Sequence, residues 1–285
     1  MSNQVPMSFV KQFEGNVMHL AQQGRSKLEA KVMTDSFAAE TKSYERIGVT
    51  EMQEKNVRHG DTPIMDTPHS RRVLTAVPYE WNDLVDKEDD VQMLISPTSE
   101  YAMAAAKAAG RKIDDVIIAA ANGDAKSGKD GATPVPFPPA QVIAASTSGM
   151  TLAKLIEASE KFNLADIDPD EPKCMVIGPK QVSDMLNIPE LTSADFTQLR
   201  ALWDGKFVHY MGFDFVMSNR LALSGSDRQC LAFTRQGIKY GIRSNQKTRI
   251  SERADKSYAT QVYLSLDIGA VRMEEAQVVQ IDCQE

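Results

Sequence analysis

The sequence predicts an α+β fold in which several extended segments need a neighbouring surface. A long helical pattern covers residues 97–122, two extended stretches flank residues 58–72, and the C-terminal part is rich in strand-forming residues. With 285 residues, of which 42% are hydrophobic and 25% charged, the chain has an ordinary globular composition and can bury a large core.

The N-terminal part predicts an amphipathic helix. Over residues 8–23, Phe9, Phe13 and two further apolar side chains recur at helical spacing, and Gly24 follows as a natural stop. The apolar stripe needs a partner, which is either the rest of the chain or another chain.

The next segment predicts a long hairpin. Residues 42–50 and 71–81 both look extended, and the second stretch alternates with period two. Between them lies RHGDTPIMDTPHSRR, residues 58–72, in which Pro63 and Pro68 keep the preceding residues out of the helical region. A two-stranded hairpin of this length is marginal alone in water, so we expect it to lie on another surface.

The strongest helix prediction covers residues 97–122. Ser96 is a suitable N-cap, Pro97 fits the first helical position, and Asn122-Gly123 supplies the stop. Such a helix would be about 39 Å long at about 1.5 Å per residue. Its alanine-rich middle allows close packing, which suits a central helix on which other elements lie.

Residues 123–140 form a Gly- then Pro-rich loop that predicts a boundary, after which helices alternate with strands. The expected elements are a helix over 151–163, an apolar strand over 173–179, helices over 180–187 and 193–205, and a hairpin over 206–219. The hairpin is expected to turn at Met211-Gly212, and the strand-rich remainder is expected to return to the long helix.

Composition excludes some functions. The formal charge of −7 argues against sequence-independent binding of nucleic acid through a basic face. Cys174, Cys230 and Cys283 lie far apart without metal-ligand spacing, which predicts buried thiols in a reduced chain. No secretory signal and no apolar run of about 18–20 residues is present, so we expect a soluble protein without a membrane span.

Two stretches could carry chemistry. His59, Asp61, Asp66 and His69 are metal-ligand types, and a metal-dependent enzyme built on them is one alternative function. Turn chemistry is the preferred interpretation, because two prolines interrupt the stretch and no further His–carboxylate cluster supports it.

The second stretch, GDAKSGKD at residues 123–130, approaches a phosphate-binding loop. It follows a helix rather than a strand, and Asp130 stands where a hydroxyl group would bind Mg²⁺, so a surface loop is preferred. His19 and His209 lie in no recognisable catalytic motif. No catalytic, metal or cofactor-binding residue is therefore predicted.

The order of the elements resembles the major capsid protein of tailed double-stranded-DNA bacteriophages, with the Hong Kong 97-type fold. The stretches that carry the resemblance are KSYERIG, RHGDTPIMDTPHSRRVL, YEWNDLVDKEDDVQMLISPTSEYAMAAAKAAGRKIDDVIIAAANG and LAFTRQGIKYGI, densest between residues 42 and 123. The resemblance implies a non-enzymatic protein that assembles as pentamers and hexamers into the icosahedral head around the phage DNA. An encapsulating nanocompartment of the same fold is a further alternative.

The resemblance also implies a division of the chain and a set of contacts. The expected segments are an N-terminal arm (1–41), an extended loop (42–90), a peripheral domain with the long helix (91–149), an axial domain (150–222) and returning peripheral strands (223–285). The expected contacts between subunits are Arg58, Asp61, Asp66, His69, Arg71 and Arg72 on the loop, with Phe9 and Phe13 on the arm.

The implied partners are other copies of the chain, a separate scaffolding protein, a portal protein and a possible decoration protein. Packaged double-stranded DNA would be enclosed without sequence-specific binding, and no cofactor or membrane is implied. The chain would be made and assembled in the host bacterial cytoplasm and would end in the virion.

Overall fold

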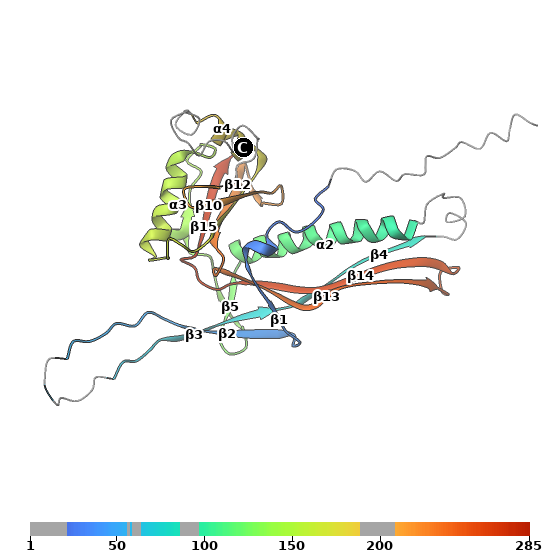
Figure 1. Ribbon diagram of the computed structural model, residues 1–285, viewed down its shortest axis with the longest axis horizontal. Helices are drawn as coiled ribbons and strands as arrows, with labels where there is room; N and C mark the ends of the chain where they lie inside the picture. Colours follow the sequence, from blue (N-terminus) through green and yellow to red (C-terminus); the bar gives the residue numbers. More distant parts are fainter. Residues whose placement is uncertain (1–21, 56–57, 59–63, 86–96, 189–208) are drawn as a thin grey trace, which may run out of the picture. The chain divides into compact units, whose positions relative to one another are not determined.

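The computed structural model describes residues 22–55, 58, 64–85, 97–188 and 209–285. These residues form two compact units. Figure 1 labels their helices and strands along the chain. The described part of the smaller unit comprises residues 22–25, 78–85, 97–111 and 245–266, and the larger unit comprises the described residues of 26–77, 112–244 and 267–285. The helices predicted over 8–23 and 193–205 lie outside the described residues.

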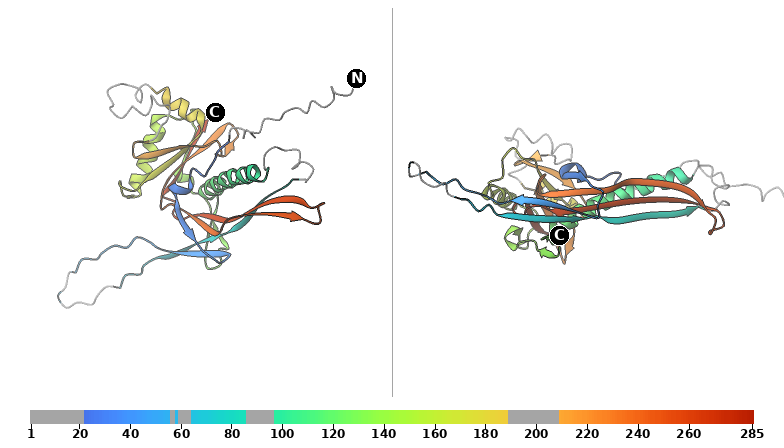
Figure 2. Two further views of the ribbon diagram at one scale, coloured as in Figure 1. Left: turned by 45° about the vertical axis from the view of Figure 1, so that its right-hand side comes forward. Right: turned by 90° about the horizontal axis from the view of Figure 1, so that it is seen from below.

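The long helix is confirmed. Helix α2 covers Pro97–Asn122, which are the bounds predicted from the sequence. In the smaller unit its buried side chains are small, Ala105 and Ala109, whereas in the larger unit they include Ile117 and Ile118. The alanines allow the helix backbone to approach the four-stranded sheet described next, beside which the helix runs in Figures 1 and 2.

A four-stranded sheet has the order β1-β13-β14-β4. Its strands are Met33–Ser36, Ile238–Arg253, Ala259–Arg272 and Val77–Val85, taken in that order. Along β14, buried side chains such as Val262 and Leu264 alternate with less buried ones such as Tyr263. One face of the sheet is thus closed, as expected for a strand pair that packs on a helix.

A second sheet of seven strands belongs to the larger unit. Its order is β7 (Val142–Ile143), β15 (Val278–Gln284), β12 (Asp227–Thr234), β8 (Lys173–Ile177), β10 (Phe213–Met217) and β9 (His209–Tyr210), with β11 (Leu223–Ser224) paired to β12. Helices α3 (Leu152–Leu164) and α4 (Pro179–Leu186) accompany it. The Phe162 ring of α3 lies 5.8 Å from the Phe213 ring of β10.

Several predicted elements of this sheet are confirmed. All five residues of β8 are buried, as its apolar run predicts. The hairpin turns at Met211-Gly212, where both residues have positive φ (49° and 80°). The C-terminal strands divide between two sheets, because β13 and β14 belong to the four-stranded sheet while β12 and β15 belong to this one. Strand β8 lies inside the sheet and pairs with β10 on one side and with β12 on the other. Strands from both sides of the expected boundary at residue 222 therefore share one sheet.

The predicted hairpin is confirmed in part: strands β2 (Thr41–Ile47) and β3 (His69–Thr75) pair antiparallel along their whole length, whereas residues 77–81 of the predicted second stretch belong to β4 in another sheet. β3 also pairs with β5 (Ala125–Ser127), which pairs with β6 (Thr133–Val135). Part of the segment predicted as a loop, 123–140, therefore forms a second hairpin, followed by the short 3-10 helix Pro139–Gln141. Gly128 and Gly131 lie in its turn at φ 90° and 69°, which glycine adopts without strain.

Asp114 of α2 fixes the first described residues of the larger unit. Its side chain is fully buried and accepts hydrogen bonds from Ser26 Oγ (2.6 Å) and from the backbone N–H groups of Lys27 and Leu28 (3.1 Å each). These bonds hold the turn that precedes the 3-10 helix Glu29–Lys31.

Replacing Asp114 by Asn is expected to lower the free energy of unfolding by about 1.5 kcal/mol, because hydrogen bonds to a charged group become neutral ones. The local effect should be larger, and trypsin should cleave after Arg25, Lys27 and Lys31 several times faster than in the wild type. Asp115→Asn is the matched control, since Asp115 binds Arg220 at the surface (Nε–Oδ1 2.7 Å). Equal cleavage rates in the two variants would contradict this role.

All three cysteines are free and buried, as predicted. Burial raises the pKa of the Cys174 thiol to about 12, so this thiol is unreactive. Among the described residues, no helix is long and apolar enough to cross a membrane.

Candidate inter-subunit contact

The segment between β2 and β3 presents apolar side chains to solvent. Val49 is 92% exposed and Ile64 is 96% exposed, and three further members of the group, Ile47, Met52 and Met65, are also exposed. In Figure 1 the described residues 48–55 and 64–68 run on from the two strands, away from the sheet. A chain that leaves this many apolar groups in water within one segment has a surface suited to a partner.

The structure places only some of the predicted contact residues. Arg58, Asp66 and His69 are exposed. Asp61, Phe9 and Phe13 lie outside the described residues, as does His59 of the metal hypothesis. In the part of the chain that is described, no three His, Cys, Asp or Glu side chains are arranged to hold a metal ion.

Arg71 and Arg72 point to opposite faces of β3. Arg71 lies opposite Glu45 of β2, and its Nε donates to Glu45 Oε1 at 2.6 Å in an exposed position. Arg72 is only 3% exposed and forms an ion pair with Glu275 of its own chain. A buried arginine offers no surface to a neighbouring subunit, so Arg72 is left out of the proposed contact.

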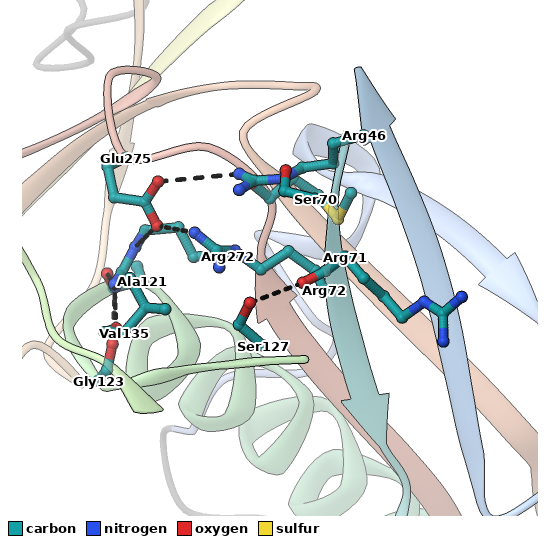
Figure 3. A network of polar contacts seen from close by, with 11 residues as sticks. Arg46, Ser70, Arg71, Arg72, Ala121, Gly123, Ser127, Val135, Arg272 and Glu275 are labelled. Atoms are coloured by element: carbon teal, nitrogen blue, oxygen red, sulfur yellow. Dashed lines mark hydrogen bonds and ion pairs between the residues drawn. The ribbon is translucent and has the colours of Figure 1, made fainter. Parts of the chain in front are cut away.

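Arg72 belongs to a cluster of three arginines around one carboxylate, which we call the Glu275 cluster (Figure 3). Glu275 Oε1 accepts from Arg72 Nη2 and lies 3.7 Å from Arg272 Nε, and its Oε2 lies 3.8 Å from Arg46 Nη1. Arg46 also donates to the backbone oxygen of Met273 and to Ser70 Oγ. The cluster therefore joins β2, β3 and the turn that follows β14.

Arg272 extends the Glu275 cluster to the end of α2. Its side chain is fully buried, and it donates to the backbone oxygens of Ala121 (2.9 Å), Gly123 (2.7 Å) and Val135 (3.0 Å). The last carbonyl groups of a helix carry partial negative charge, which favours a cation there. Burial lowers the pKa of Arg272, and the Glu275 carboxylate opposes this shift.

The Glu275 cluster thus fixes the base of the β2–β3 hairpin, whereas the segment beyond it is exposed. Ser127 Oγ of β5 adds a bond to the Arg71 backbone oxygen (3.0 Å). Sequence reasoning missed Arg46, Arg272 and Glu275. One signal was available, because Arg272 ends an apolar run, and an arginine among buried positions needs a carboxylate or carbonyl partner.

Solved structures with a similar fold include phage capsids. The capsid of cyanophage P-SCSP1u superposes with a TM-score of 0.77 at 14% identity, covering 100% of this chain and 96% of the other. The capsid of Ralstonia phage GP4 gives 0.73 at 10% identity (97% and 95% covered). The Mycobacterium phage Che8 protein gives 0.70 at 15% identity (96% and 97% covered).

At these identities the structures are evidence of fold. A search of curated protein sequences gave no match. The family described as phage capsid protein matches residues 5–285, which is nearly the whole chain. The chain therefore belongs to the phage capsid protein family and is a major capsid protein with the Hong Kong 97-type fold.

Proposed function

We propose that copies of this major capsid protein assemble as pentamers and hexamers, and that the segment between β2 and β3 binds a neighbouring copy. The protein is a structural component of the icosahedral phage head. The observation that carries the proposal is the contrast between the two ends of the hairpin. The Glu275 cluster fixes its base, while Val49, Met52 and Ile64 expose apolar surface beyond it.

Burial of these side chains against a neighbour would supply the driving force. Each fully buried aliphatic side chain contributes about 1.5–3 kcal/mol relative to water, and the same contact is repeated at every subunit of a shell. Arg58 and Asp66 lie on the same exposed segment, His69 is the exposed first residue of β3, and all three are proposed to pair across the boundary. Exposed ion pairs are each worth about 0–1 kcal/mol, so they would set register rather than affinity.

The assembly test replaces residues 49–67 by Asn-Gly. Gly48 N donates to Pro68 O at 2.8 Å, so these two backbone positions lie within the span of a two-residue loop. The unassembled subunit is expected to keep its circular dichroism spectrum and its free energy of unfolding within about 1 kcal/mol, because the Glu275 cluster is untouched. Electron microscopy of this variant is expected to find no closed shells.

A milder variant, Val49→Ser with Ile64→Ser, should assemble with a reduced yield, because it removes apolar surface and keeps the segment length. Closed shells of normal diameter from the Asn-Gly variant would overturn the proposal. The fold would be unaffected by that result.

The remaining partners are proposed from the resemblance. They are packaged double-stranded DNA, a portal protein, a separate scaffolding protein and possibly a decoration protein, with synthesis in the host bacterial cytoplasm. The net charge of −7 supports enclosure of DNA without tight binding. DNA in purified particles distinguishes a phage head from an encapsulating nanocompartment. The family supports no metal-dependent enzyme.

A further inference from the structure

Strand β13 has an edge that its own chain covers only in part. β1 pairs with it in parallel over four positions, from Met33↔Lys239 to Ser36↔Ile242, and Phe37 N then donates to Ile242 O at 3.1 Å. β14 occupies the other side of β13. Beyond residue 242, no described strand pairs with β13 on the side of β1.

An open edge of this kind is a template for a further strand. Its backbone N–H and C=O groups point sideways and can pair with an extended segment. β1 shows that this edge accepts a parallel strand. Residues 247–253 are all exposed.

The side chains of the open edge define what it can accept. Because side chains alternate along a strand, Lys247, Arg249 and Ser251 share one face, and Thr248 and Ile250 share the other. The first face is basic, and Ile250 on the second is 53% exposed. Like charges directly opposite each other destabilise a strand pair, so two such edges would not pair with one another. An acidic or apolar segment would be accepted.

Residues 49–53 have the matching pattern. They are exposed, belong to no strand of their own chain, and contain no proline. In a parallel register that sets Glu51 opposite Arg249, Met52 falls opposite Ile250 and Val49 falls opposite Lys247. On one face Glu51 then pairs with Arg249 by charge, and on the other face Met52 meets Ile250 in an apolar contact. The second described stretch of the segment, 64–68, ends in Pro68, which has no N–H group to donate.

We propose that residues 49–53 of one subunit add as a parallel strand to residues 247–251 of β13 in a neighbouring subunit. This inference rests on the proposed function and names the surface that the exposed segment binds. The proposal accounts for the exposed segment and for the open edge of β13 together, since the exposed Met52 and the exposed Ile250 would contact each other in the added strand pair.

A cross-link tests the contact directly. Particles of the Met52→Cys, Ile250→Cys variant are purified from bacteria that express the chain with the phage's other head proteins, and then oxidised with glutathione disulfide. The expected result is a ladder of covalently linked subunits on a non-reducing gel. The control pair Met52→Cys, Lys256→Cys, with the second cysteine in the turn after β13, should remain monomeric. A link confined within single chains would overturn the proposal.

A charge exchange tests the register. Glu51→Arg and Arg249→Glu are each expected to lower the particle yield about tenfold, because the small loss at one contact is repeated throughout the shell. The combined variant is expected to recover a yield within about threefold of the wild type, since the pair is restored with opposite polarity. Glu51→Arg with Lys256→Glu restores net charge only and should not recover.

The outcomes separate the two proposals. If the wild type forms shells while both single variants assemble normally and no cross-link forms, β13 is not the docking surface and the proposed function stands. If the Asn-Gly variant of the segment also forms normal shells, the proposed function fails as well.

Discussion

Replacing Glu275 by Gln is expected to lower the free energy of unfolding of the unassembled subunit by about 3 kcal/mol. Removing one partner of a buried ion pair typically costs about 3–5 kcal/mol, because the other charge stays buried without compensation. Here Arg72 and Arg272 are both buried, while the Glu275 carboxylate is partly exposed, which favours the lower end of that range. Glutamine keeps the size of the side chain and one acceptor oxygen, so the change isolates the charge.

The measurement is urea unfolding of the unassembled subunit followed by circular dichroism. Glu274→Gln is the matched control, since this neighbouring carboxylate is exposed and accepts from Gln277 Nε2 (2.8 Å). Its expected effect is below about 0.5 kcal/mol. If the two variants lose similar stability, the three arginines do not depend on Glu275, and the carbonyl oxygens around Arg272 are sufficient.

The Glu275 variant should also affect assembly. The cluster joins β2 and β3 to the end of α2, so its loss would loosen the base of the exposed segment. We therefore expect Glu275→Gln to lower both the stability of the subunit and the yield of shells. The Asn-Gly variant should lose assembly but keep the stability of the subunit. Comparison of Glu275→Gln with the Asn-Gly variant thus distinguishes the role of the Glu275 cluster in supporting the segment from the role of the segment in binding a neighbouring subunit.

The elements predicted best were those determined by local sequence. The bounds of α2 were predicted from a candidate capping serine, a first-turn proline and a terminal Asn-Gly, all within one segment. The β2–β3 hairpin and the Met211-Gly212 turn were likewise predicted from adjacent residues. The β5–β6 hairpin was missed because its strands have three residues each and obtain their stability from pairing with β3.

The burial of the predicted contact residues could be foreseen only in part. Arg71 and Arg72 are adjacent in a strand, so one of them must point to each face. The sequence does not show which of the two side chains is buried. That depends on Glu275 and on its other partners Arg46 and Arg272, which are distant from β3 in the sequence or lie on other strands. The resemblance to capsid proteins pointed to the segment, and the structure distinguishes the half-buried Arg71 from the buried Arg72.

Lys154 presents a second buried charge that composition alone does not reveal. It lies in the first turn of α3 and is 5% exposed. A cation is disfavoured at the N-terminal end of a helix, because the N–H groups there carry partial positive charge. The ammonium group compensates by donating to four backbone oxygens at 2.9 Å, those of Ala145, Ser148, Gly149 and Asp282.

These bonds connect the loop before α3 to strand β15. The loop contains Ser146 and Thr147 at φ 48° and 55°, a region that residues other than glycine adopt only at some cost. Carbonyl oxygens that converge on a cation hold this conformation without a carboxylate. The position has a sequence signal, since Lys154 precedes the buried Ala158 by four residues and so shares its helical face.

Replacing Lys154 by Met is expected to lower the free energy of unfolding by about 2–4 kcal/mol. Methionine fills similar space but donates nothing, and each buried acceptor that loses its partner costs about 1–3 kcal/mol. Ser148 O keeps a bond from Gln284 N (3.0 Å), and Ala145 O keeps bonds from Ser148 N (3.0 Å) and Ser148 Oγ (2.9 Å), so the loss falls mainly on Gly149 O and Asp282 O. Lys161→Met is the control on the same helix, because Lys161 donates to a single carbonyl, Ala140 O, in an exposed position. Urea unfolding should show a loss below about 1 kcal/mol for that control. Equal losses would mean that water enters the Lys154 site and satisfies its oxygens, in which case the ammonium group is not what holds the loop against β15.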